Sequence, residues 1–318
     1  MGNKGKKIVI LGAGNVGASI AYTLTVQGVA SEIVLIDINF NKAKGEAMDI
    51  IQGTAFCPPV NIYAGQYENA KDADIVIVTV GAARKPGQSR IDLAQGNVNI
   101  VKQVMPQIIP YAPHAVYVVV SNPVDIITYA IIKTTDLRPS QVIGSGTTLD
   151  SARLRARLAE HVGLNPKNVH AYVLGEHGDS SVIPWSLATI GGIPMNTYCL
   201  EICKEHNRCG KAELREIEED VRTAGAKVIA NKGATYYAIA LAVSRICACI
   251  IRDTGSVLTV SSLLSGQYGL SDVCLSIPYV IGAYGISHSI VSPLTAPEQQ
   301  QLEQSAAALR DVLNSLEF

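Results

Sequence analysis

The chain of 318 residues carries a formal net charge of −1 and is 48% hydrophobic, so it can build a sizeable core in one large domain or two. The sequence holds no basic block, which argues against nucleic acid as a main partner, and no apolar run approaches the length of a membrane-spanning helix. Seven scattered cysteines and a short polar N-terminus without a signal-peptide pattern favour a reducing cytoplasm.

The first forty residues predict a strand, a helix and a second strand. Residues 8–11 form a short apolar run rich in β-branched side chains, which is typical of a buried strand. Residues 15–27 show helical spacing, and residues 32–36 form a second buried run that ends at Asp37.

A glycine pattern, G-x-G-x-x-G, joins the first strand to the helix. The first glycine permits a tight turn, the second lets a pyrophosphate approach the backbone, and the third lets helix and strand pack closely. Free N–H groups at the helix start bind the anion. An acidic residue about twenty positions further on accepts hydrogen bonds from both ribose hydroxyls and repels a 2′-phosphate. The whole unit predicts bound NAD rather than a glycine turn that binds nothing. The residues expected to bind the cofactor here are Gly12, Gly14, Asn15, Val16, Gly17 and Asp37.

Strands and helices then alternate up to residue 144. The run IVIVTV at residues 75–80 is typical of a central parallel strand. Such alternation predicts an α/β fold with a doubly wound parallel sheet, a Rossmann NAD domain, over residues 1–144. The other elements expected here are helices at 41–51, 91–109 and 125–134, and strands at 60–64, 115–120 and 141–144.

Two segments follow the central strands at their carboxyl ends. Gly81 and Ala82 come directly after residues 75–80, where a backbone without bulk can lie against a dinucleotide. Residues 84–90 then hold three cations together with proline and glycine. A charged loop is often only solvated. This one could instead fold over a bound anion and exclude water.

The second half of the chain contains a candidate acid/base. His177 lies between small, flexible residues just past an expected strand at 169–174, a position suited to proton transfer. Asp150 and Arg153 are three residues apart on a predicted helix and therefore share one face. Asp150 is the candidate carboxylate to hold the imidazole in one tautomer, although the sequence alone does not bring the two together. The alternative is an ordinary surface or core histidine.

The remaining elements predict an α+β substrate-binding and catalytic domain over residues 145–318. Its expected elements are helices at 213–232, 236–251 and 295–316, and antiparallel strands at 257–261 and 273–280. Cys199, Cys203, His206 and Cys209 have a spacing that could ligate zinc. We expect no metal there, because structural zinc sites usually show tighter paired spacing.

With these motifs in hand, the chain resembles the L-lactate/malate dehydrogenase family over nearly its whole length. The segments that carry the resemblance are GAGNVG, SNPVD, GSGTTLDSARLR, GEHGDSSV and KGATYY. The resemblance implies an NAD-dependent oxidoreductase that acts on a small 2-oxo or 2-hydroxy acid. It also implies a homotetramer.

The resemblance implies roles for individual residues. His177 would donate and accept the proton, with Asp150 as its partner. Arg153 would bind the substrate carboxylate as a bidentate fork, which suits a planar guanidinium better than lysine. Arg90 would polarise the carbonyl once its loop closes. The remaining implied contacts are Asn122 to the substrate oxygen near the nicotinamide, Thr235 in the substrate pocket and Ile239 behind the nicotinamide ring.

The sequence positions that indicate the substrate point in two directions. Arg84 falls at the family position that reads the far end of the substrate, where malate enzymes have Arg and lactate enzymes often have Gln. Glu176, Trp185 and Thr235 resemble the lactate enzymes instead. We expect pyruvate and L-lactate, with oxaloacetate and malate as the alternative. A non-catalytic NAD-binding protein is a more distant alternative, since fold does not dictate function.

Two further residues match an effector site in bacterial relatives. Arg155 and His170 fall at positions where bacterial lactate dehydrogenases bind fructose 1,6-bisphosphate between subunits. A cationic pair repeated by a two-fold axis would form an anion site. The alternative is that these residues bind no effector: Arg155 would be an exposed charge on a helix, and His170 an ordinary residue at the end of a strand.

Overall fold

The computed structural model describes the backbone of residues 5–82, 89–199 and 211–318. Its largest feature is a nine-stranded sheet with the order β12-β11-β10-β6-β5-β4-β1-β2-β3. The strands from β6 to β3 are parallel, and the chain order reverses between β1 and β4, which confirms the predicted doubly wound sheet. The parallel strands are β1 (Lys7–Leu11), β2 (Glu32–Ile36), β3 (Asn61–Ala64), β4 (Ile75–Val78), β5 (Val116–Val119) and β6 (Val142–Gly144).

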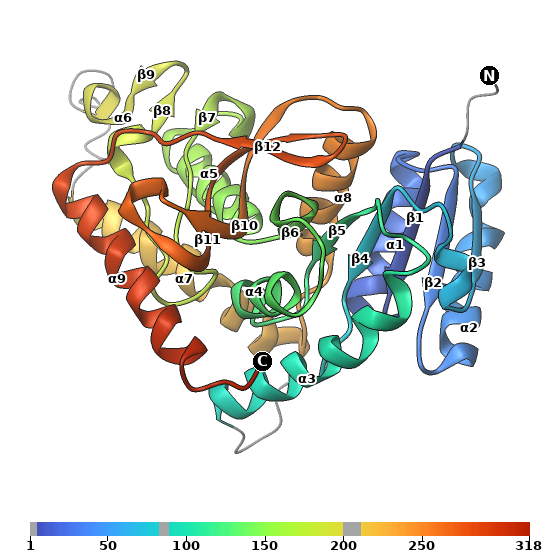
Figure 1. Ribbon diagram of the computed structural model, residues 1–318. Coiled ribbons are helices and arrows are strands. Elements are labelled where there is room, and N and C mark those ends of the chain that lie inside the picture. The colour runs from blue at the N-terminus through green and yellow to red at the C-terminus, as the bar shows by residue number, and fades with distance from the viewer. Residues whose placement is uncertain (1–4, 83–88, 200–210) are drawn as a thin grey trace.

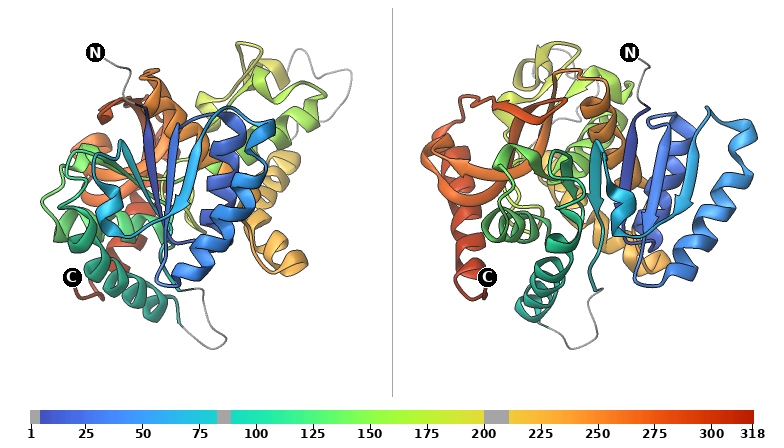
Figure 2. Two further views of the ribbon diagram at one scale, coloured as in Figure 1. Left: turned by 90° about the vertical axis from the view of Figure 1, so that its right-hand side faces the viewer. Right: turned by 45° about the vertical axis from the view of Figure 1, so that its right-hand side comes forward.

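Helices cover both faces of the parallel strands (Figures 1 and 2). α1 packs against α2 and α8, while α3 packs against α4. All residues of β4 and β5 are buried, as expected for strands covered on both faces. The helices are α1 (Asn15–Gln27), α2 (Phe40–Gln52), α3 (Arg90–Ile108), α4 (Val124–Thr134) and α8 (Tyr237–Ile251).

The predicted antiparallel pair is confirmed and is longer than expected. β10 (Ser256–Ser265) and β11 (Ser271–Gly282) form a hairpin, and β10 also pairs with β6 through Ser261 and Gly144. The second half of the chain therefore extends the sheet of the first half, and a domain boundary at residue 144 stays a prediction. The other elements are α5 (Thr148–Val162), β7 (Val169–His170), β8 (Thr189–Ile190), β9 (Ile193–Pro194), α6 (Met195–Thr197), α7 (Lys211–Lys232), β12 (Gly285–Ser289) and α9 (Ala296–Leu313).

The predicted strand at residues 169–174 is interrupted: Val169 and His170 form β7, and Leu174 forms an isolated antiparallel bridge with Val182. The N–H of Val173 donates to Ser151 Oγ at 2.9 Å, and its carbonyl accepts from the hydroxyl of Thr147. Side chains near the start of α5 thus take hydrogen bonds that a strand neighbour would otherwise supply. None of the helices in the described ranges combines the length and apolarity needed to cross a bilayer.

Candidate active site

A cavity of about 760 Å³ lies at the carboxyl ends of β1, β2 and β4. Gly12, Gly14, Asp37, Gly81 and Ala82 line it, so these predicted cofactor residues are brought together. The other three from the glycine motif, Asn15, Val16 and Gly17, form the first turn of α1 beside it.

The motif glycines have different local roles. Gly12 has φ +99°, and a Cβ there would lie 2.7 Å from Thr79 Oγ1. A Cβ on Gly17 would lie 1.9 Å from the carbonyl oxygen of Gly12, so only glycine lets helix and turn approach. A Cβ on Gly14 would meet no atom within 4 Å, which leaves open space before the helix N-terminus. This open cradle fits the pyrophosphate of a dinucleotide.

Asp37 is fixed beside the glycine turn. Its Oδ2 accepts the N–H of Ala13 at 2.7 Å, and its Oδ1 accepts the N–H of Asn39 at 2.8 Å. Ile38 and Phe40 also line the cavity and were not predicted, although their position just after Asp37 was an available signal. Asp37 therefore lines the cavity in a fixed orientation.

A buried asparagine links the ends of two central strands. Asn97 is 2% exposed; its Oδ1 accepts the N–H of Ala82 at 2.8 Å, and its Nδ2 donates to the carbonyl of Asn122 at 2.7 Å. Asn122 itself is exposed and precedes a cis peptide bond to Pro123. The sequence marks Asn97 only as a polar residue within a helix, and it was not predicted.

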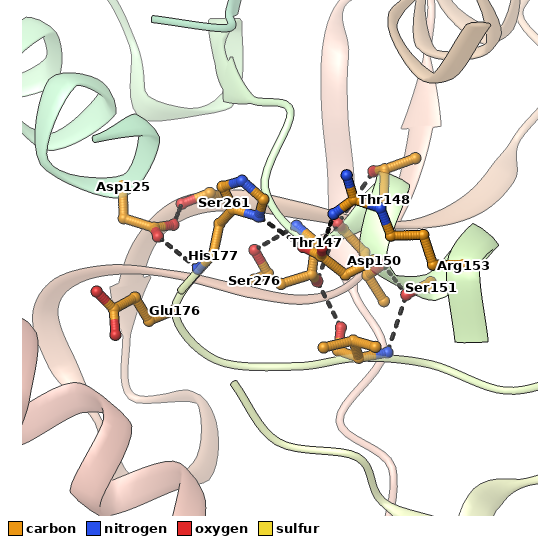
Figure 3. A network of polar contacts seen from close by, with 12 residues as sticks. Asp125, Thr147, Thr148, Asp150, Ser151, Arg153, Glu176, His177, Ser261 and Ser276 are labelled. Atoms are coloured by element: carbon orange, nitrogen blue, oxygen red, sulfur yellow. Dashed lines mark hydrogen bonds and ion pairs between the residues drawn. The ribbon is translucent and has the colours of Figure 1, made fainter. Parts of the chain in front are cut away.

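The predicted acid/base pair meets in the structure (Figure 3). His177 Nδ1–H donates to Asp150 Oδ2 at 2.5 Å, and Arg153 donates to Asp150 Oδ1 at 2.8 Å. The Asp150 side chain is 10% exposed, while those of His177 and Arg153 are 28% and 19% exposed. One carboxylate therefore orients both an imidazole and a guanidinium.

The charges of this group shift two pKa values in opposite directions. Burial alone would raise the pKa of Asp150, but the hydrogen bond and charge of His177 and the charge of Arg153 lower it. Burial alone would lower the pKa of His177, but the hydrogen bond and charge of Asp150 raise it above the ordinary 6.5. The pair thus favours a charged imidazolium beside a carboxylate.

A second carboxylate, which was not predicted, lies behind His177. Asp125 is 3% exposed; its Oδ2 accepts the main-chain N–H of His177 at 2.8 Å, and its Oδ1 accepts the hydroxyl of Ser261 at 2.5 Å. Burial raises the pKa of Asp125 to about 6, despite the opposing effect of these two hydrogen bonds.

Replacing Asp125 by asparagine should change how stability depends on pH. The folded pKa of about 6 lies above the ordinary 3.8, so the folded state binds more protons, and stability present below pH 3.8 is lost as pH rises through about 6. The difference between these two pKa values corresponds to about 3 kcal/mol of unfolding free energy. Between about pH 4 and pH 7, urea unfolding should show the wild type losing about this much relative to Asp125→Asn. A difference between the two proteins that does not vary with pH would contradict the expectation.

The segment that carries His177 is held from α9 as well. Ser305 Oγ accepts the N–H of Glu176 at 2.9 Å, and the Ser180 hydroxyl donates to the Glu176 carboxylate. Gly175 has φ +84°, and a Cβ there would lie 2.7 Å from Ser305 Oγ. Consecutive main-chain amides at Glu176 and His177 are therefore fixed by two different elements.

The structure describes the remaining predicted residues to different extents. Arg84 lies outside the described residues, and of Arg90 only the backbone, at the start of α3, is described. Thr235 is half-buried in the turn before α8, and Ile239 is half-buried in the first turn of that helix. Of the suggested zinc ligands, Cys203, His206 and Cys209 lie outside the described residues.

Arg155 reaches the strand that contains His170. Its Nε donates to the carbonyl of Val169 at 2.8 Å, and a terminal nitrogen donates to the carbonyl of Pro166 at 3.2 Å. His170 is exposed. Arg155 and Arg245 also line a cavity of about 400 Å³. Arg155 thus bonds to the residue that precedes His170 in the chain.

Comparisons with known proteins cover the whole chain. The family model of the lactate/malate dehydrogenase NAD-binding domain matches residues 6–144, and that of the α/β C-terminal domain matches residues 147–317. An L-lactate dehydrogenase of Acetivibrio thermocellus is 49% identical over 315 residues, 98% of each chain. L-lactate dehydrogenase 1 of Clostridium acetobutylicum is 47% identical over 313 residues, 98% of this chain and 99% of the relative. The crystal structure of minor L-lactate dehydrogenase from Enterococcus mundtii has a TM-score of 0.94 and 40% identity, covering 98% and 99% of the two chains.

Proposed function

The chain belongs to the lactate/malate dehydrogenase family, and from this premise we propose that it catalyses the reversible NADH-dependent reduction of pyruvate to L-lactate. The predicted family, NAD cofactor and oxidoreductase class are confirmed. The observation that carries the proposal is the bonding of His177 and Arg153 to one carboxylate, that of Asp150. Full-length relatives named L-lactate dehydrogenase support the choice of substrate.

The chain's own residues fit the binding of the cofactor. Gly14 leaves the N-terminus of α1 open to the pyrophosphate, and Asp37 lies where it can accept from the ribose hydroxyls. When bound, the reduced nicotinamide supplies the hydride. We assign Asn122 and Ile239 to the nicotinamide end by family likeness.

The protein supplies the proton and binds the acid. His177, kept charged by Asp150, donates its proton to the ketone oxygen and takes it back in the reverse reaction. Arg153 binds the substrate carboxylate with the guanidinium edge that Asp150 does not use. By family likeness we assign Arg90 to polarising the ketone and Thr235 to lining the pocket.

Arg84 supports oxaloacetate as the alternative substrate. A guanidinium at this position of the sequence would pair with the second carboxylate of oxaloacetate, and one such contact can outweigh several apolar ones. The Arg84→Gln variant tests this role directly. If Arg84 reads the far carboxylate, the variant loses oxaloacetate reduction and keeps pyruvate reduction.

Fructose 1,6-bisphosphate is the effector that we propose for Arg155 and His170, bound between subunits of a homotetramer. The family likeness supports this assembly. Exposed apolar side chains on α2 and α8, those of Met48 (51% exposed), Ile51 (41%) and Leu241 (55%), also favour a protein partner. We further propose a cytoplasmic location, which the free thiols of Cys57, Cys247, Cys249 and Cys274 support.

One experiment tests these proposals together. With NADH at one pH, kcat/KM for pyruvate should exceed that for oxaloacetate by at least about tenfold. The bisphosphate should lower the half-saturating pyruvate concentration, and Arg155→Gln should abolish that response while keeping basal turnover. Light scattering with and without the bisphosphate measures the assembly. A preference for oxaloacetate contradicts the substrate, and an unchanged half-saturation contradicts the effector.

A further inference from the structure

We propose that Asp125 is a positioning residue for this reaction: its buried carboxylate fixes the main chain of His177 and places a negative charge behind the imidazole. This inference rests on the proposed function, because it concerns how His177 is prepared to donate a proton.

In the described structure, the buried carboxylate of Asp125 accepts hydrogen bonds from neutral donors only. One oxygen accepts the main-chain N–H of His177 at 2.8 Å, and the other accepts the hydroxyl of Ser261 at 2.5 Å (Figure 3). Burying a carboxylate without a paired cation costs several kcal/mol. An asparagine could accept the same N–H without that cost, so the negative charge itself calls for an explanation.

The position of Asp125 joins three parts of the site. It lies in the first turn of α4, three residues after Asn122 in the segment that joins β5 to α4. Ser261 lies on β10, 136 residues further along the chain, and His177 lies on the segment that follows Leu174. The carboxylate therefore holds the catalytic segment against the strand end that carries Asn122.

The charges around the imidazole show what Asp125 adds. Asp150 and Asp125 both favour the charged form of His177, and Arg153 opposes it. Two carboxylates thus act on the imidazole against one guanidinium.

Two further titratable groups face Asp125 itself. Glu176 from the same segment as His177 raises the pKa of Asp125. The thiol of Cys274 on β11 is buried, and burial raises its pKa well above 9.0, so it stays neutral.

The Asp125→Asn variant separates the charge from the hydrogen bond. Pyruvate reduction needs a charged His177, so the alkaline limb of kcat/KM should move to lower pH. Lactate oxidation needs a neutral His177, so near pH 7 it should rise by up to about threefold. Below about pH 6 the profiles of variant and wild type should converge, because Asp125 itself becomes neutral there.

The Ser261→Ala variant is the matched control, because it removes a hydrogen bond to Asp125 and leaves a carboxylate that is still charged in the alkaline range. Its alkaline limb should stay in place. A purely structural role would lower both reaction directions in both variants without moving either limb, and that result would overturn the proposal.

A measurement without turnover keeps the test independent of the proposed function. In protein labelled with ¹³C at its six histidines, His177 is assigned by the signal missing from His177→Asn. Its titration midpoint should fall in Asp125→Asn, and an unchanged midpoint would overturn the proposal. If Asp125→Asn does not fold, the wild-type signal should show a smaller second step near pH 6 that moves upward in Ser261→Ala. A single step would overturn the proposal. Absence of turnover in the wild type would instead contradict the proposed function.

Discussion

Replacing His177 by asparagine should lower kcat/KM for pyruvate by about 10²- to 10⁴-fold, the usual contribution of a positioned acid/base. An amide cannot deliver a proton to the ketone oxygen, although it can still donate a hydrogen bond to Asp150. Steady-state kinetics in both directions measure the loss, which should appear for pyruvate reduction and for lactate oxidation alike.

NADH binding provides the control for this variant. The residues that line the dinucleotide cavity do not include His177, so the dissociation constant for NADH, measured by fluorescence titration, should stay within about twofold. Retained turnover in His177→Asn would exclude this residue as the proton donor. Loss of NADH binding would mean that the substitution disturbed the fold rather than the chemistry.

The dinucleotide site could be predicted because its signals are local. Gly12, Gly17 and Asp37 lie within one strand–helix–strand unit, and each meets a steric or hydrogen-bonding demand set by near neighbours. The sheet order followed from the same alternation of strands and helices. A short stretch of sequence contains enough information to fix this part of the fold.

The main-chain support of His177 by Asp125 could not be predicted because its contacts are distant in sequence. Asp125 has the pattern of an acidic residue in the first turn of a helix, where a favourable dipole is explanation enough. Only the fold brings it to His177, 52 residues away, and to Ser261, 136 residues away. The strand predicted at 169–174 is interrupted for a related reason, since hydroxyls of Thr147 and Ser151 take the hydrogen bonds of Val173.

The Asp150→Asn substitution should affect activity and stability together. The carboxylate holds His177 in one tautomer and orients Arg153, so its loss should lower kcat/KM for pyruvate by about 10³- to 10⁴-fold, as in other acid/base pairs. The alkaline limb of the remaining activity should move to lower pH, because the carboxylate that raises the pKa of His177 is gone. Combining Asp150→Asn with His177→Asn should add little, since the two residues act as a unit.

The stability effect of Asp150→Asn should depend on pH in a defined direction. The lowered pKa of Asp150 contributes stability that is present above 3.8 and lost as pH falls through the folded value. The raised pKa of His177 contributes stability that is present below 6.5 and lost as pH rises through its folded value. Urea unfolding should therefore show the largest destabilisation, about 2 kcal/mol, between these values and a smaller one near pH 9.

Asp220→Asn on α7 is the matched control, since the same chemical change removes a carboxylate whose partners, Arg157 and Lys227, are substantially exposed. Exposed ion pairs contribute little, so this variant should keep kcat/KM within about twofold of the wild type. If Asp220→Asn lost as much activity as Asp150→Asn, general electrostatics rather than the His177 pair would be responsible. If Asp150→Asn kept its alkaline limb in place, the carboxylate would not be the group that holds the imidazole charged.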